Sequence, residues 1–344
     1  EDTGVLEQKV QAIDNISYDE KIKIVLNELK DKQDQYLSED ALTTYSPKFK
    51  MMLQNIKLPD HEGLHLIYSS FRTLEGIGIL KLILEANGFM QLQIKKDAGG
   101  WGINITEENK DIPKFALYTG TETVEEKEII RNIFNGAWEY IPSSISSVLR
   151  AISPNNLLGE IVKILMITAS GAEGISLKNV RYVHITEPYW HYVRLDQVIG
   201  RARRICSHED LPKDMQTVDV FLYLMKFSDA QLESDDAIEL RLKDKSRIDR
   251  YTPITSDEHL YEIATAKKEV SSKLLQAIKE ASIDCNLHSK AGDKEAIQCF
   301  TFGSASPEQQ AYQPSISQEE SDDIADRNKT IVKIKAVEVT LDGV

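Results

Sequence analysis

The 344-residue sequence lacks any apolar run close to the roughly 18 residues that a membrane-spanning helix needs. It has only three cysteines, Cys206, Cys285 and Cys299, and their wide spacing forms neither a metal-binding set nor a disulfide framework. Acidic residues outnumber basic ones by 55 to 41, and the resulting net charge of −14 argues against a protein coated in nucleic acid. We therefore expect an intracellular protein with no membrane partner, whose contacts with nucleic acid, if any, depend on a local basic strip.

The sequence also lacks the phosphate loop of a nucleotide hydrolase. No G-x-x-x-x-G-K-[ST] motif occurs, and no acidic pair follows an apolar strand as a magnesium site would require. Asp257-Glu258-His259 spells part of a DExH box, but it opens a predicted helix, where acidic residues suit the N-terminal dipole. We interpret these residues as a helix start and predict no metal site in this chain.

Apolar segments alternate with helical patterns along the middle of the chain. Strands are predicted at residues 63–69, 114–119, 163–168, 181–186 and 216–227, and the last of these has the nearly continuous apolar run of a buried strand. Helices are predicted from Leu74 to the region of Gly88, at 124–134 after a cap at Thr121 or Thr123, and at 257–281. Strands that alternate with helices indicate an α/β fold with a parallel sheet.

The ends of the chain differ from this middle part. Residues 1–60 are mostly helical in pattern, with Ser46 as an N-cap and Pro47 at the first helical position. Residues 91–112 are predicted to be an insertion, residues 303–326 a mobile linker and residues 330–341 an edge strand. We expect four parts, at 1–60, 61–230, 231–302 and 303–344. Because the sequence begins with Glu1 rather than methionine, we also expect a fragment of a longer protein.

The segment from Ile164 to Arg204 carries the most informative pattern. An apolar strand, a Gly-rich turn and a second strand lead to a Q-x-x-G-R-x-x-R pattern at Gln197 to Arg204. Arg201 and Arg204 are three residues apart, so on a helix they would share a face. Arginine is always charged and its planar fork matches phosphate oxygens, so two such groups suit the charge that develops as a γ-phosphoryl group leaves. Five arginines gather around these segments: Arg181, Arg194, Arg201, Arg203 and Arg204.

These residues resemble motifs V and VI of superfamily-2 helicases and translocases. Gly171 to Leu177 stands at the position of motif V, Gln197 to Arg204 at motif VI, and Ser69 to Arg72 at motif IV. Within the superfamily, residues 45–289 are most similar to helicase-like NTPases of large DNA viruses, of the poxvirus early-transcription-factor type. The resemblance implies a RecA-like parallel sheet flanked by helices, with helical N-terminal and mixed C-terminal extensions.

The same resemblance implies the C-terminal half of an ATP-dependent helicase or translocase. The full enzyme would hydrolyse ATP and move along DNA or RNA, in viral transcription or genome processing. Magnesium would be held mainly by a missing N-terminal RecA-like domain, so this chain alone should be inactive. Expected partners are nucleic acid, that missing domain and viral transcription machinery, in the cytoplasm of an infected cell or in a virion.

The resemblance also assigns roles to individual residues. Arg201 and Arg204 would be catalytic arginine fingers. Nucleotide contacts are implied for Gln197, Gly200, Glu173 and Gly174. Nucleic-acid contacts are implied for Ser69, Ser70, Arg72, Thr119, Gly120, Ser170 and Gly171, through hydroxyl, backbone N–H and guanidinium groups.

Each assignment has a simpler alternative. The arginines could form a solvated basic face, Glu173 a structural salt bridge, Gly200 a packing contact, and the remaining glycines, serines and threonines ordinary turns. Arg203 could be a surface charge or part of an ion pair. Trp190, with its neighbours Tyr189 and His191, could stack on a base or brace motif VI against the sheet. His184 lies between Val183 and Ile185 and is expected to be buried.

Two other functions stay open. A Swi/Snf-like double-strand DNA translocase is suggested by Gly174-Ile175-Ser176-Leu177 and Trp190, although Gly200 stands where that branch has aspartate. A non-catalytic nucleic-acid-binding or transcription-factor subunit would keep the fold without turnover. The intact arginine pair weighs against that second alternative.

Overall fold

The computed structural model describes residues 18–169, 174–234, 253–282 and 285, and the two short strands at 301–302 and 314–315. The chain divides into two compact units, residues 1–264 and 265–344. The sheet and the motifs lie in the first unit. No helix in the described part of the chain is long and apolar enough to cross a membrane.

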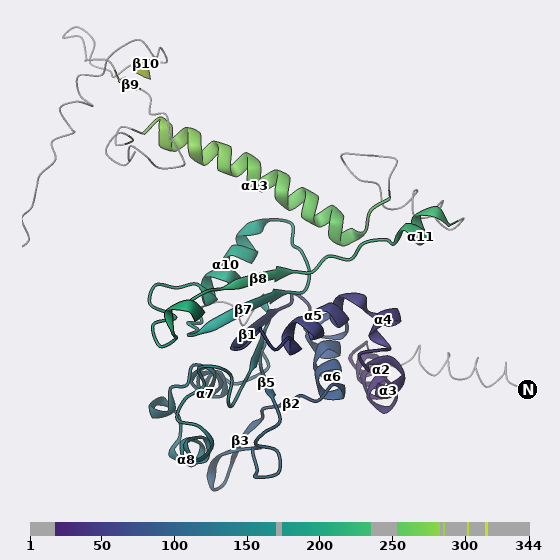
Figure 1. The fold of residues 1–344 in the computed structure, drawn as a ribbon, viewed down its shortest axis with the longest axis vertical. Helices are drawn as coiled ribbons and strands as arrows, with labels where there is room; N and C mark the ends of the chain where they lie inside the picture. Colours follow the sequence, from purple (N-terminus) through teal and green to yellow (C-terminus); the bar gives the residue numbers. More distant parts are fainter. Residues whose placement is uncertain are drawn as a thin grey trace, which may run out of the picture. The chain divides into compact units, whose positions relative to one another are not determined.

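A six-stranded parallel sheet forms the centre of the first unit (Figure 1). Its order is β2-β5-β6-β1-β7-β8, and all five pairings are parallel. The strands are β1 (Leu64–Tyr68), β2 (Met90–Gln91), β5 (Lys114–Tyr118), β6 (Ile164–Ile167), β7 (Val180–Ile185) and β8 (Asp219–Leu222). All residues of β1 are buried, as expected for a strand that pairs on both edges and is covered on both faces. The predicted α/β fold with a parallel sheet is therefore confirmed.

Helices cover both faces of the sheet (Figure 1). The side chains that pack on one face come from α4 (Leu42–Tyr45), α5 (Pro47–Lys57) and α6 (Ile79–Ala86), next to α2 (Tyr18–Asp31) and α3 (Gln33–Tyr36). Those on the other face come from α7 (Val124–Phe134), α8 (Ser143–Ile152) and α10 (Tyr192–Ala202). Short helical turns occur at η1 (Leu74–Gly78), η2 (Trp138–Tyr140) and η3 (Lys213–Met215).

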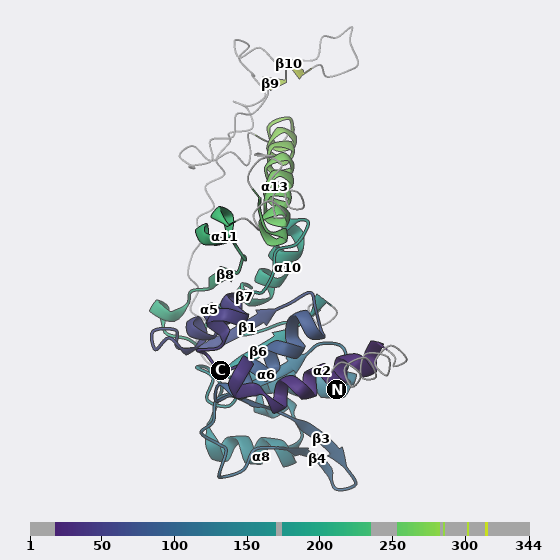
Figure 2. The same cartoon turned by 90° about the vertical axis from the view of Figure 1, so that its right-hand side faces the viewer.

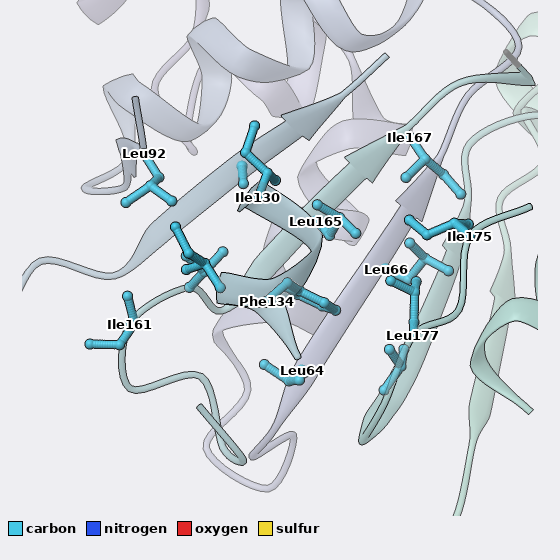
Figure 3. Packing of buried hydrophobic residues seen from close by; sticks show 14 of the residues in the cluster. Leu64, Leu66, Leu92, Ile130, Phe134, Ile161, Leu165, Ile167, Ile175 and Leu177 are labelled. Carbon is cyan, nitrogen blue, oxygen red and sulfur yellow. The ribbon is translucent and has the colours of Figure 1, made fainter. Parts of the chain in front are cut away.

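The strand side chains alternate between these two layers. Leu64 and Leu66 of β1 point into the α7 layer together with Leu165 and Ile167 of β6, whereas Ile67 points into the other layer. Figure 3 shows side chains of the α7 layer, with Phe134 of α7 among them. This alternation fixes the register of the sheet, because a slip of one residue would move each apolar side chain to the opposite face.

The remaining described elements lie outside the sheet. A hairpin of β3 (Ile94–Asp97) and β4 (Gly100–Ile103) projects beside α8 (Figure 2), where the Ser144 hydroxyl donates to the Trp101 carbonyl oxygen at 2.6 Å. The other elements are α11 (Asp229–Glu233), α13 (Ser256–Glu280), β9 (Thr301–Phe302) and β10 (Pro314–Ser315). The hairpin lies within the predicted insertion at residues 91–112 and has its tip at Ala98 and Gly99.

Several predicted boundaries are confirmed. The first four predicted strands are β1, β5, β6 and β7. Thr123 caps α7 through a capping box, in which it accepts from the Glu126 N–H at 3.2 Å while Glu126 accepts from the Thr123 N–H at 2.7 Å. The segment Asp257-Glu258-His259 lies at the start of α13, as interpreted. Asp257 pairs with Lys48 of α5 and accepts from the Met225 N–H at 2.9 Å.

Other predictions are wrong. The apolar run at 216–227 forms only the four-residue edge strand β8, whose Val220 is 41% exposed. The regular helix after β1 begins at Ile79 instead of Leu74, because Gly76 has non-helical dihedrals. Ser46 occupies the N-cap position of α5, but its side chain makes no capping hydrogen bond. Cys285 is disulfide-bonded, although the wide spacing of the cysteines predicted no disulfide framework.

Part of the sequence-based scheme cannot be compared with the structure. The predicted linker at 303–326 lies outside the described residues apart from Pro314 and Ser315, and the predicted strand at 330–341 lies wholly outside them. The first 17 residues are likewise outside the described part.

Candidate nucleotide and nucleic-acid site

The candidate site lies at one edge of the sheet. Because β1, β5, β6 and β7 are parallel, the loops that follow them emerge at the same edge, which is where open α/β sheets bind ligands. The loops after β1 and β5 contain five of the seven residues predicted to contact nucleic acid. The other two, Ser170 and Gly171, follow β6 with motif V and lie outside the described residues. The structure thus brings the predicted segments together although they are far apart in sequence.

Helix α10 presents most of motif VI. Its buried face consists of Leu195, Val198 and Ala202, which pack into the sheet core. Gln197 is exposed, and Arg201 lies one turn further along the same face and is half-buried. The Nε atom of Arg201 is buried and has no hydrogen-bond partner within the described residues. A buried guanidinium donor without a partner is costly, and an anionic oxygen would satisfy it.

Gly200 leaves open space beside Arg201. A Cβ atom placed on this glycine would meet no described atom within 4 Å. The described residues therefore give no support to a packing role for Gly200. The space beside it is compatible with a ligand that approaches the backbone of α10.

The expectation that Arg201 and Arg204 share a helix face is wrong. Helix α10 ends at Ala202, and Arg203 is its C-cap with φ −101° and ψ 75°. Arg204 follows in a turn, where its N–H donates to the Ser207 hydroxyl at 3.2 Å. His208 Nε2 lies 2.7 Å from the Val180 carbonyl oxygen and ties this turn to β7. Arg204 is thus exposed on a braced turn beyond the helix.

Motif V is described only in its second half. Ser170, Gly171 and Glu173 lie outside the described residues. Gly174 is exposed with φ 73°, a left-handed conformation that favours glycine.

The segment after Gly174 is fixed by Asn135, at the C-cap of α7. This side chain donates to the Ser176 carbonyl oxygen at 3.0 Å and accepts from the Lys178 N–H at 2.9 Å. Both contacts involve the backbone of the motif V segment, so they hold its path without depending on the side chain at 176.

The loop after β1 is organised by a glutamate that the sequence interpretation missed. Glu187, after β7, accepts from the Ser70 N–H, and the Ser69 hydroxyl donates to its two oxygens at 3.2 and 3.3 Å. Ser69 is fully buried, while Arg72 of the same loop is exposed. Burial raises the pKa of Glu187, although its hydrogen bonds to Ser70 and Ser69 oppose that effect.

The loop after β5 has the same arrangement around Glu122. This carboxylate accepts from the Thr119 N–H at 2.8 Å, the Gly120 N–H at 3.0 Å and the Thr119 hydroxyl at 3.1 Å. Burial raises the pKa of Glu122, but hydrogen bonds from backbone N–H groups outweigh burial and leave the pKa lowered. A cavity of about 260 Å³ lies beside Glu122, between α7 and the segment that leads into the hairpin.

The aromatic residues after β7 divide into two kinds. Tyr189 packs against the core, and the Arg194 guanidinium of α10 lies 3.9 Å from its ring centre. This contact supports the bracing alternative for Tyr189. Trp190 is 52% exposed, so stacking on a base remains compatible with its position.

The described residues fit an anionic ligand better than a metal ion. Arg201 offers an unpartnered donor, which suits a nucleotide phosphate. Among the described residues, no group of three His, Cys, Asp or Glu side chains could hold a metal. Arg203 is exposed, and no ion pair involves it in the described part of the chain.

Comparison with known proteins identifies the family. The family "Helicase conserved C-terminal domain" matches residues 107–206. The "Termination factor NPH-I homolog" of African swine fever virus is 32% identical over 281 residues, which cover 75% of this chain and 35% of that protein. A "Putative ATP-dependent RNA helicase" of Acanthamoeba polyphaga mimivirus is 27% identical over 80% of this chain and 29% of its own length.

The chain spans about a third of the length of these curated relatives. The family match covers motifs V and VI and the strands β5, β6 and β7 that position them. The chain therefore carries the C-terminal domain of a superfamily-2 helicase, and its homologues are helicases of large DNA viruses, including the NPH-I homologue of African swine fever virus.

Proposed function

We propose that this chain is the C-terminal half of an ATP-dependent nucleic-acid motor and that Arg201 and Arg204 act on the γ-phosphate of ATP. The observation that carries the proposal is the Nε atom of Arg201 on α10, which is buried and has no hydrogen-bond partner among the described residues. Gln197 and Gly200 on the same helix extend this surface toward the nucleotide. Magnesium and the phosphate loop would belong to a second RecA-like domain.

The two arginines have different tasks in this proposal. Arg201 is held by a rigid helix packed on the sheet, so it supplies a preorganised charge at small reorganisation cost. Arg204 lies on a turn braced by Ser207 and His208, and it reaches the phosphate from another direction. Together they neutralise the charge that spreads over the phosphoryl oxygens during transfer.

The loops after β1, β5 and β6 would contact the backbone of a DNA or RNA strand. Arg72, Gly120 and Gly174 are exposed at this edge, and Ser170 and Gly171 belong to the same set of loops. Such contacts are made to phosphates and carry little sequence information. The African swine fever virus relative is named a termination factor, and this supports a place in viral transcription.

Kinetics of the full-length protein with a phosphate-loop domain test this proposal. We expect Arg201→Ala and Arg204→Ala each to lower kcat by about 10³-fold, because each removes charge from the transferring phosphoryl group, while nucleotide affinity changes little. Arg203→Ala is the matched control and should leave kcat near wild type. A change confined to KM would show that the arginines anchor only the ground state. ATP turnover by the 344-residue chain alone that depends on Arg201 would contradict the half-site proposal.

A further inference from the structure

Two glutamates occupy hydrogen-bond donors at the sheet edge that would meet a nucleic-acid strand. Glu187 holds the Ser70 N–H and the Ser69 hydroxyl, and Glu122 holds the N–H groups of Thr119 and Gly120. Strands β5 and β1 flank β6 on either side, so the two carboxylates belong to loops on opposite sides of β6. The same arrangement therefore occurs independently on two loops.

Hydrogen bonds, rather than ion pairs, hold both carboxylates. Within the described residues, neither glutamate has a lysine or arginine nitrogen within salt-bridge distance. Adjacent backbone N–H groups that converge on one oxygen form an anion-binding concavity. Glu122 Oε2 occupies such a position, at 2.8 Å from the Thr119 nitrogen and 3.0 Å from the Gly120 nitrogen.

We propose that Glu122 and Glu187 are internal substitutes for strand phosphates: they occupy the phosphate-binding donors of the unbound chain and are displaced when nucleic acid binds. This inference rests on the proposed nucleic-acid function. A phosphate and a carboxylate cannot use the same N–H groups, and two anions at such short range repel each other. The strand must therefore move each carboxylate away before it can make these backbone contacts.

Arg72 supplies the attraction that favours this exchange. It is exposed, two residues beyond Ser70, and makes no salt bridge in the part of the chain that the structure describes. A phosphate that replaces Glu187 at the Ser70 N–H would gain a nearby guanidinium, which Glu187 itself does not contact. The Arg72 guanidinium thus favours an anionic ligand from outside the chain over Glu187 at this edge.

The alternative is that both glutamates are permanent clamps that shape their loops. The two possibilities predict opposite effects of neutralisation. If the glutamates are clamps, neutralising them should loosen the loops and lower the affinity for the strand. If they compete with the strand, neutralising them should raise that affinity.

The test compares Glu122→Gln, Glu187→Gln and the control Glu125→Gln in the 344-residue chain. Glutamine keeps one carbonyl oxygen for the N–H groups but removes the charge. Glu125 is exposed on the first turn of α7 and pairs with Lys96 at 2.8 Å, so its substitution removes the same charge nearby without vacating a loop. Affinity for a fluorescent single-stranded oligo-dT is measured by anisotropy, with thermal unfolding of each variant.

We expect each loop variant to bind about tenfold more tightly than wild type, the effect of removing one nearby like charge, and the control to change affinity by less than about twofold. Unchanged or weaker binding by both folded loop variants would overturn the inference.

If a variant does not fold, a measurement on the wild-type chain decides. The amide resonances of Ser70 and Gly120 should shift on addition of oligo-dT, and unchanged resonances under saturation would overturn the inference. Absence of oligo-dT binding by every protein would overturn the proposed function as well, whereas binding that ignores both glutamates overturns only this inference.

Discussion

Two buried histidines organise a closed hydrogen-bond network between the sheet and α5. His184 Nε2 lies 2.9 Å from His65 Nδ1, and His184 Nδ1 lies 2.8 Å from the Tyr223 hydroxyl, which also accepts from the Asn55 amide at 2.9 Å. His65 Nε2 reaches the His61 carbonyl oxygen at 3.3 Å. Because Asn55 donates to the Tyr223 hydroxyl, that hydroxyl can donate to His184 Nδ1. The His184 Nε2–H then donates to His65 Nδ1, and the His65 Nε2–H donates to the His61 carbonyl oxygen. With this assignment each ring carries one proton, so both histidines are neutral.

This network predicts loss of stability in mild acid. Burial lowers the pKa of His184 to about 3 and that of His65 well below its usual value. Between these values and the ordinary pKa of about 6.5, the unfolded chain binds protons that the folded chain does not. The contribution of the two histidines to the free energy of unfolding should be fully present above pH 6.5. As the pH falls below 6.5, it should decrease by up to about 1.4 kcal/mol per pH unit for each histidine.

Urea unfolding between about pH 5 and 7 measures this effect, because most carboxylates stay ionised there. The slope should decrease in a folded His184→Phe variant, which removes one of the two titrating groups. A free energy of unfolding that stays constant across this window would contradict the neutral network.

At the residue scale, short-range patterns could be predicted and long-range partners could not. Gln197, Gly200 and Arg201 follow from a motif of eight consecutive residues. The contact from Glu187 to Ser70 spans 117 residues, and no local pattern links them. The only available signal was an acidic residue immediately after a strand that ends at the ligand-binding edge.

At the scale of helices and strands, Gly200 of α10 is expected to lower stability and to support function. Glycine within a helix is about 0.5–1 kcal/mol less favourable than alanine, and a Cβ here meets no described atom within 4 Å. We expect Gly200→Ala to raise the free energy of unfolding by that amount and to lower ATP turnover in the full-length protein. Denaturant unfolding measures the change in stability, and steady-state kinetics measures the change in ATP turnover. Unchanged turnover in a stabilised variant would show that the nucleotide does not use this space.

Gly76 has the opposite role in the turn after β1. A Cβ at this position would lie 2.1 Å from the Phe71 carbonyl oxygen and 2.4 Å from Ser69 Oγ, so the loop would have to shift. We expect Gly76→Ala to cost about 1–3 kcal/mol, as overpacking does, and to weaken strand binding. Gly102→Ala is the control, since its nearest contact would be 3.9 Å away. Equal unfolding midpoints for the two variants would contradict this role.

The order of strands explains why some elements were predicted better than others. Residues 114–119 and 163–168 contain the inner strands β5 and β6, and all of β6 is buried, so an apolar run and burial coincide there. The run at 216–227 is equally apolar but ends at the sheet edge, and only Asp219–Leu222 pairs with β7. The apolar composition of a segment does not show which strands pair with it, so an edge strand could not be distinguished from a central strand. The end of α10 at Ala202 was missed because no glycine or proline marks it.

At the scale of the whole molecule, net charge and local charge have opposite signs. The chain carries −14 overall, yet Arg72, Arg201, Arg203 and Arg204 belong to the motif segments, and Arg194 lies just before motif VI. Long-range repulsion and short-range attraction therefore act together on a nucleic-acid strand. Since salt screens distant charges more than close ones, binding should reflect the local contacts at moderate ionic strength.

We expect weak binding of single-stranded nucleic acid whose affinity falls steeply with salt and depends little on sequence. Arg72→Ala should weaken binding to all sequences about equally and reduce the slope of log K against log salt by about 0.7, the value for one phosphate contact on a single strand. Arg150→Ala, which removes an exposed arginine from α8, is the control and should leave that slope unchanged. Anisotropy titrations with several oligonucleotides at several salt concentrations give both quantities. Salt-independent affinity, or loss of binding for one sequence only, would mean that the edge beside β1, β5 and β6 does not track phosphates, because contacts to bases would then have to supply the discrimination.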